Sequence, residues 1–118
     1  MDEDKKEAME TTECMLRAAA QAGDSAAMMQ LVEQYEPLLR RAAGQPHLLT
    51  LREDALAEGY VSFVRAVHDY DAASGVPFAG FVKARVYGDL RTLFRRTCKV
   101  WQREAAVDAR REEPFWEL

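Results

Sequence analysis

Cysteine, glycine and proline are scarce: the 118-residue sequence holds two cysteines, six glycines and four prolines. Small secreted domains pair their cysteines, and metal sites need three or four close ligands. We therefore expect Cys14 and Cys98 to be reduced, half-buried thiols. Because few Gly and Pro residues interrupt the chain, long segments with helical periodicity dominate it. The sequence predicts an all-α fold, a compact bundle of about four helices.

Long hydrophobic runs are also absent from the sequence. No apolar stretch approaches the roughly 18 residues that a bilayer-spanning helix needs. The charged start Met-Asp-Glu-Asp-Lys-Lys has no apolar signal core behind it. Hydrophobic residues make up 48% and charged residues 31% of the chain, which is typical of one soluble globular domain. We expect a cytoplasmic protein with no membrane contact.

Motifs for covalent chemistry are missing as well. The sequence contains neither a GxGxxG nor a GxxxxGK phosphate-binding loop. His47 and His68 are isolated, so neither has a positioned partner for acid–base catalysis. Adjacent acids such as Glu53 and Asp54 diverge by about 100° on a helix and would not share a metal ion. We expect no enzyme activity, no cofactor and no metal site.

Apolar residues at spacings of three and four predict helices over residues 11–21, 25–43, 52–70 and 77–104. Between the first two, Gly23 suits the left-handed position after a helix end, and Asp24 or Ser25 suits the N-cap of the next helix. Gly59 in the third helix indicates close packing by a neighbouring helix. We expect an N-terminal extension at 1–17 that is partly disordered or helical, and a helical domain at 18–104.

An acidic and aromatic tail is expected at 105–118. Phe115 and Trp116 stand near its end. The tail either folds back onto the core or is disordered, or it presents these two rings to a partner.

Charge is divided unevenly along the chain. Residues 1–80 hold seven bases and fourteen acids, a net charge of −7, whereas residues 81–111 hold nine bases and three acids, a net charge of +6. On a helical wheel of the predicted fourth helix, most of these bases lie away from the apolar arc, with Phe78 and Phe81 within or at the edge of the basic arc. Basic side chains can bind phosphates, and exposed aromatic rings can stack on unpaired nucleobases. The pattern therefore favours nucleic-acid binding. Alternatively, both rings pack under the turn at the helix start, and the bases only solvate the helix.

An ungapped run of residues crosses the third and fourth predicted helices: Asp54, Glu58, Gly59, Ala66, Val67, Tyr70, Asp71, Gly75 and Phe78. It is preceded by Ala-Gln-Ala-Gly-Asp at 20–24 and by Leu-Val-Glu-Gln-Tyr-Glu-Pro-Leu at 31–38, and it is followed by Asp-Leu-Arg at 89–91 and Leu-Phe-Arg-Arg at 93–96. Over residues 18–100 this pattern resembles region 2 of the bacterial sigma-70 family of transcription initiation factors.

The resemblance implies two binding surfaces. In the family, the helix with the first motif docks on a coiled coil of the largest catalytic subunit of RNA polymerase; the matching residues are Asp54, Ala57, Glu58, Tyr60, Val61 and Val64. The next helix recognises the −10 promoter element on the non-template strand, where an aromatic takes up a flipped base, and Phe81 stands at that position. The candidate DNA contacts are Phe78, Phe81, Lys83, Arg85, Arg91, Arg95, Arg96 and Lys99.

The sequence departs from the family pattern at three places. Ala57 replaces a usual glutamine, and Ala84 and Arg85 replace the tryptophan pair of housekeeping members. A full factor also has a helix-turn-helix region 4 for the −35 element, for which 118 residues leave no room. The chain is then a fragment, or a separate polypeptide supplies region 4, or the chain is a regulator that uses only the polymerase contact.

Two other functional classes stay open. The first is a protein-interaction module that binds polymerase or a regulator, such as an anti-sigma factor, and does not bind DNA. A buried Phe81 favours this class. The second is an unrelated helical structural protein, in which the motif run arises by chance.

Overall fold

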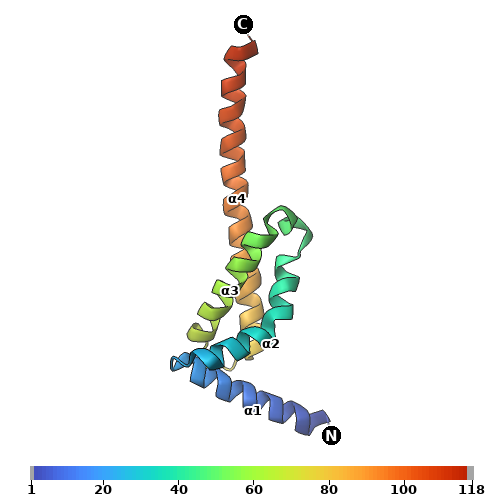
Figure 1. Ribbon diagram of the computed structural model, residues 1–118, viewed down its shortest axis with the longest axis vertical. Coiled ribbons are helices and arrows are strands. Elements are labelled where there is room, and N and C mark those ends of the chain that lie inside the picture. The colour runs from blue at the N-terminus through green and yellow to red at the C-terminus, as the bar shows by residue number, and fades with distance from the viewer. Residues whose placement is uncertain (1, 117–118) are drawn as a thin grey trace.

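Four α-helices and two short 3-10 helices make up the part of the chain that the structure describes. The computed structural model describes residues 2–116 and, except at positions 2, 6 and 111–116, their side chains. The elements are α1 (Asp2–Gln21), α2 (Ser25–Ala43), η1 (Pro46–Leu51), α3 (Arg52–Asp69), η2 (Ala72–Ser74) and α4 (Phe78–Trp116), as Figure 1 shows. The predicted all-α bundle is confirmed.

The turn between α1 and α2 forms as its sequence predicts. Gly23 has a φ of 104°, which residues with a side chain rarely adopt. The amide of Asp24 donates to the Ala19 carbonyl at 3.0 Å and so satisfies an unpaired acceptor at the end of α1. The Asp24 carboxylate accepts from the amides of Ala26 and Ala27 and caps α2.

The core lies where α3 packs between α2 and α4, with α1 against α2. A row of aliphatic residues on α4, Val82, Val86 and Leu90, is completely buried. Because these residues follow one another at spacings of four, they form a single stripe on that helix. The largest buried side chains contributed by the rest of the chain are Leu31, Leu39, Leu48, Phe63 and Val67.

Helix α2 packs against α3 at Gly59. This glycine is buried, and a Cβ built on it would lie 3.9 Å from Cδ2 of Leu39, which is ordinary van der Waals contact. The prediction that a neighbouring helix packs at Gly59 is therefore confirmed. Pro37 lies within α2, also as predicted.

Helix α1 begins much earlier than predicted. It starts at Asp2, and Thr11 and Thr12 lie inside it instead of capping it. Their hydroxyls donate to the carbonyls of Glu7 and Ala8, four residues back. The described side chains from Glu3 to Thr12 are all exposed, so this half of α1 has no apolar face for a periodicity search to detect. The high helix propensity of Glu, Lys and Ala favours the helix there.

Helix α4 continues past residue 104, the predicted end, to Trp116. The proposed boundaries after residues 17 and 104 therefore both fall inside helices. The C-terminal half of α4 stands clear of the bundle and gives the molecule a long axis of 76 Å (Figure 1). Val100 and Trp101 are 48% and 43% exposed because the bundle no longer covers them.

The two cysteines differ in their exposure to solvent. Both cysteines are free, but Cys14 is exposed and only Cys98 is half-buried. The side chains of Phe115 and Trp116 lie outside the described residues.

The buried ring of Phe63 gives a test of the core. Phe63 is 0% exposed, and its ring centroid lies 5.2 Å from that of Tyr35. Replacing Phe63 with Ala removes most of this contact and leaves a cavity, so the free energy of unfolding should fall by about 3–5 kcal/mol. Urea unfolding followed by circular dichroism measures the change. Val61→Ala on the same helix is the control and should change stability by less than about 0.5 kcal/mol. Equal effects of the two substitutions would contradict this core.

Candidate protein and nucleic-acid interfaces

The outer face of α3 carries four of the six residues matched to polymerase docking. Asp54, Ala57 and Val61 are exposed, and Val64 is half-buried. At about 100° per residue these four fall within an arc of about 80°, on the side of α3 opposite Phe63. Val61 leaves 44% of its surface in water, so an apolar side chain is accessible on this face. The four residues form one continuous surface.

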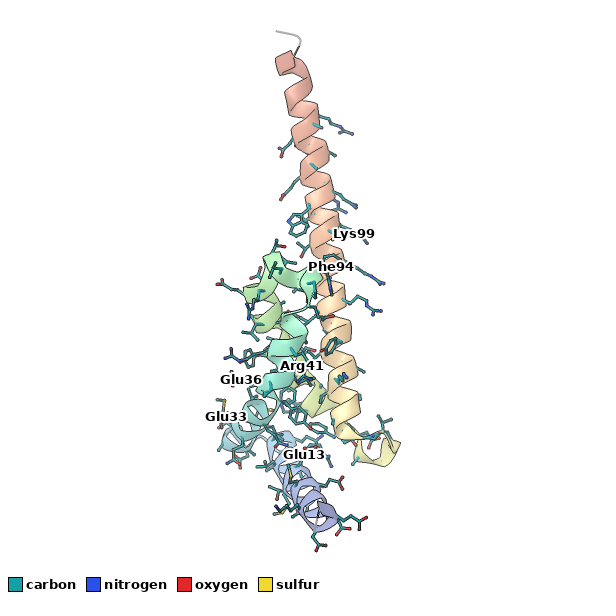
Figure 2. All side chains as sticks on the ribbon, turned by 90° about the vertical axis from the view of Figure 1, so that its right-hand side faces the viewer. Glu13, Glu33, Glu36, Arg41, Phe94 and Lys99 are labelled. Carbon is teal, nitrogen blue, oxygen red and sulfur yellow. The ribbon has the colours of Figure 1, made fainter. Side chains whose placement is uncertain are left out.

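Tyr60 lies toward α2 and is already engaged there. Its hydroxyl donates to Oε1 of Glu36 at 3.2 Å, and the same oxygen accepts from Nη2 of Arg40 at 2.7 Å. The hydrogen bond from Arg40 and that from Tyr60 lower the pKa of the Glu36 carboxyl. Because the Glu36 carboxylate is open to water, its ion pair with Arg40 adds little to the free energy of unfolding. Figure 2 shows Glu36 on α2.

Glu58 lies on the opposite flank of α3 from Tyr60, about 160° away around the helix. It faces a shallow groove between α3 and α4, whose lining residues are Glu58, Arg65, Arg85, Asp89, Thr92, Leu93 and Arg96. The six residues matched to docking are therefore not one patch. Four lie on the outer face, whereas Tyr60 and Glu58 lie at opposite edges of it.

A polar chain across the α3–α4 contact engages Arg85. Buried Ser62 donates its hydroxyl hydrogen to Oδ2 of Asp89 at 2.6 Å, and Arg85 lies 3.9 Å from that carboxylate. Arg85 also donates from Nη2 to Oδ2 of Asp69 at 2.7 Å. Arg85, predicted as a phosphate contact, is therefore already paired with two carboxylates. The helical wheel missed this because Asp69 lies on another helix.

Phe78 belongs to an aromatic cluster in the core and not to an exposed face. Its side chain is 5% exposed, and its ring lies edge-on to Tyr35 and Tyr70 at centroid distances of 5.7 and 5.1 Å. The guanidinium of Arg17 lies 4.7 Å from the Tyr70 ring centre and 5.4 Å from that of Phe78, which suits a cation–π contact. For Phe78 the structure therefore matches the alternative in which the ring packs under the turn at the helix start and not the exposed ring expected of a base-stacking residue. Tyr70, which follows the end of α3, and Arg17 on α1 cover its ring, and a wheel of α4 includes neither of them.

Phe81 is only partly covered. It is half-buried, and one side of its ring packs on Tyr70 at a centroid distance of 5.4 Å. Its burial therefore lies between the exposed ring expected of a base-stacking residue and the buried ring expected of a module that does not bind DNA.

The five remaining cations of the predicted DNA surface are exposed: Lys83, Arg91, Arg95, Arg96 and Lys99. Among the described side chains, the ion pairs within 4.0 Å involve Arg40 and Arg85 and none of these five. Arg91, Arg95, Arg96 and Lys99 share an arc of about 140°, whereas Lys83 lies outside it. Figure 2 shows Lys99 beyond Phe94, where α4 leaves the bundle.

Two cations outside the predicted set continue this arc. Arg103 and Arg110 are exposed and follow Arg96 at intervals of seven residues, which keeps all three on one side of the helix. The seven-residue repeat was visible in the sequence. It was not used because the helix was expected to end at residue 104, before Arg110.

Among the described side chains, no three of His, Cys, Asp or Glu gather in a way that could hold a metal ion. None of the helices described combines the length and the hydropathy needed to cross a bilayer.

The aromatic cluster also makes stability depend on alkaline pH. Burial, and secondarily the nearby Glu13 carboxylate, raises the pKa of Tyr35 above its ordinary value of 10.0. Above pH 10 the unfolded chain loses this phenol proton while the folded chain keeps it, so the free energy of unfolding falls as pH rises. One proton accounts for at most about 1.4 kcal/mol per pH unit.

Tyr35→Phe should therefore show a shallower loss of stability than the unchanged protein. Urea unfolding at several pH values between about 9 and 11 measures both slopes. Equal slopes would show that the Tyr35 hydroxyl is not desolvated.

Comparisons with protein-family models, with curated proteins and with solved structures find no match to this chain.

Proposed function

We propose that the protein is a transcription initiation factor or regulator of the sigma region 2 type. It binds core RNA polymerase through the outer face of α3 and the non-template strand of the −10 element through α4. It acts in the bacterial cytoplasm by binding and strand separation, without a covalent step.

The single observation that carries the polymerase half is the exposed surface of Asp54, Ala57, Val61 and Val64. The exposed apolar side chain of Val61 suits a protein interface, because the buried centre of an interface is more apolar than the rest of the surface. These residues also belong to the motif run that resembles the family's docking helix. The proposal excludes Tyr60 from direct contact, because its hydroxyl is held by Glu36.

The DNA half is supported by Arg91, Arg95, Arg96 and Lys99, which are exposed on one arc of α4 without an acidic partner among the described side chains. Such an arc can follow a phosphate backbone. The partly exposed ring of Phe81 offers one stacking position for an unpaired base. Phe78 and Arg85 have no part in this surface, and Lys83 lies on another side of the helix.

A second candidate function is a polymerase- or regulator-binding module without DNA binding. The aromatic cluster favours it, because it buries Phe78 and covers one side of Phe81. Polymerase binding is common to both functions, and only the DNA experiment distinguishes them.

Two substitutions on the outer face of α3 test polymerase binding. Asp54→Arg and Val61→Asp each place an unsuitable group at the centre of the docking surface, so each should raise the dissociation constant for bacterial core RNA polymerase at least tenfold, about 1.4 kcal/mol. Fluorescence anisotropy of labelled protein measures the binding. Glu33→Arg, an equal charge change at an exposed site on α2, is the matched control and should bind normally. Unaltered binding of both α3 variants would eliminate the docking surface.

Salt dependence tests DNA binding. Binding of a single-stranded oligonucleotide with a −10-like sequence should weaken as salt rises, with a slope of about 0.7 per phosphate contact in a plot of log K against log salt. Replacing Arg95, Arg96 and Lys99 together with Ala should reduce the slope by about 2. Phe81→Ala should weaken binding by about 1–3 kcal/mol if a base stacks there.

Arg41→Ala, which removes an exposed cation from α2, is the control for the DNA experiment and should leave the slope unchanged. A slope near zero, or no binding by a protein that still binds polymerase, would exclude the DNA half and leave the interaction module.

A further inference from the structure

The two ends of the molecule carry projecting helices of opposite charge. At one end of the 76 Å axis the N-terminal half of α1 leaves the bundle, and at the other end the C-terminal half of α4 does so (Figure 1). Both halves are exposed over the described side chains from Glu3 to Thr12 and from Lys99 to Arg110. An isolated helix of this length is only marginally stable in water, so a partner would stabilise each of them.

The projecting half of α1 has an acidic side. Glu3, Glu7 and Glu10 follow at spacings of three and four and fall within an arc of about 60°. All three are exposed, and none has a cation within 4.0 Å among the described side chains. Met9 is 66% exposed and lies about 100° around the helix from Glu10.

The projecting half of α4 has the complementary side. Arg96, Arg103 and Arg110 follow at intervals of seven residues and fall within an arc of about 40°. Val100 and Val107 lie beside them, and these are 48% and 45% exposed. The α4 projection therefore combines a basic row with an apolar edge, and the α1 projection carries an acidic row. Because the two projections leave opposite ends of the bundle, they cannot meet within one molecule.

We propose that two copies of the chain associate in an antiparallel pair, in which the acidic side of α1 of each copy binds the arginine row of α4 of the other. A two-fold arrangement places the α1 end of each copy beside the α4 end of its partner, so both contacts form at once. Pairing of two α4 projections antiparallel to each other is disfavoured, because it would face one arginine row with the other. The association does not depend on the proposed function.

Mass measurement tests the pair directly. Sedimentation equilibrium of the full chain should give twice the 13.4 kDa chain mass at about 0.05 M salt and the single mass at about 0.5 M, because salt screens the contacts between exposed charges. The variant Glu3→Lys/Glu7→Lys/Glu10→Lys and the variant Arg96→Glu/Arg103→Glu/Arg110→Glu should each be monomeric at low salt, since each faces like charges at both contacts.

An equimolar mixture of the two variants gives the sharper readout. In a mixed pair one contact joins lysines to glutamates and the other joins glutamates to arginines, so the mixture should return to twice the chain mass. Glu33→Lys/Arg41→Glu on α2 is the matched control and should pair like the unchanged protein. Circular dichroism checks that each variant is folded. A monomer at low salt, a mixture that stays monomeric, or masses that exceed two copies would overturn the proposal.

Discussion

The aliphatic row on α4 determines how the rest of the molecule is arranged. Val82, Val86 and Leu90 are completely buried, so one side of α4 faces α2 and α3 and the opposite side faces water. The bundle supplies partners for this row only as far as Phe94, which packs on His47 at a centroid distance of 4.9 Å. Neither Gly nor Pro occurs between Gly88 and Pro114, so the helix continues without that cover. One periodic row is therefore core at one end and exposed surface at the other.

The packing of α3 on α4 also determines which cations of α4 lie exposed without an acidic partner among the described side chains. Ser62 is the polar side chain in the core, and a buried hydroxyl needs a partner. Asp89 supplies the acceptor, and the carboxylates of Asp89 and Asp69 hold Arg85. Arg85 therefore supports the packing of α3 on α4. The cations further along α4 lie beyond these carboxylates and remain exposed, so the basic surface begins where the packed part of the helix ends.

Local signals in the sequence predicted much of the fold. The bounds of α2 and α3 and the turn at Gly23 and Asp24 follow from apolar spacing and capping chemistry, both of which act over a few residues. The start of α1 and the end of α4 did not follow, because exposed helix leaves no apolar periodicity.

The candidate interfaces were predictable in part, for a related reason. Exposure of Asp54, Val61 and Lys99 follows from the wheel of a single helix. The burial of Phe78 and the pairing of Arg85 depend on residues from other helices, Tyr35, Arg17 and Asp69 among them, which a wheel of α4 does not contain.

The surfaces proposed for polymerase and for DNA differ in whether they share residues with the surfaces of the antiparallel pair. The outer face of α3 has no residue in common with the two projections, so polymerase binding is compatible with the antiparallel pair. Arg96 belongs both to the basic arc for DNA and to the row that faces α1 of the second copy, and it cannot bind a phosphate and a glutamate row at once. If both surfaces operate, pairing and DNA binding must therefore exclude each other.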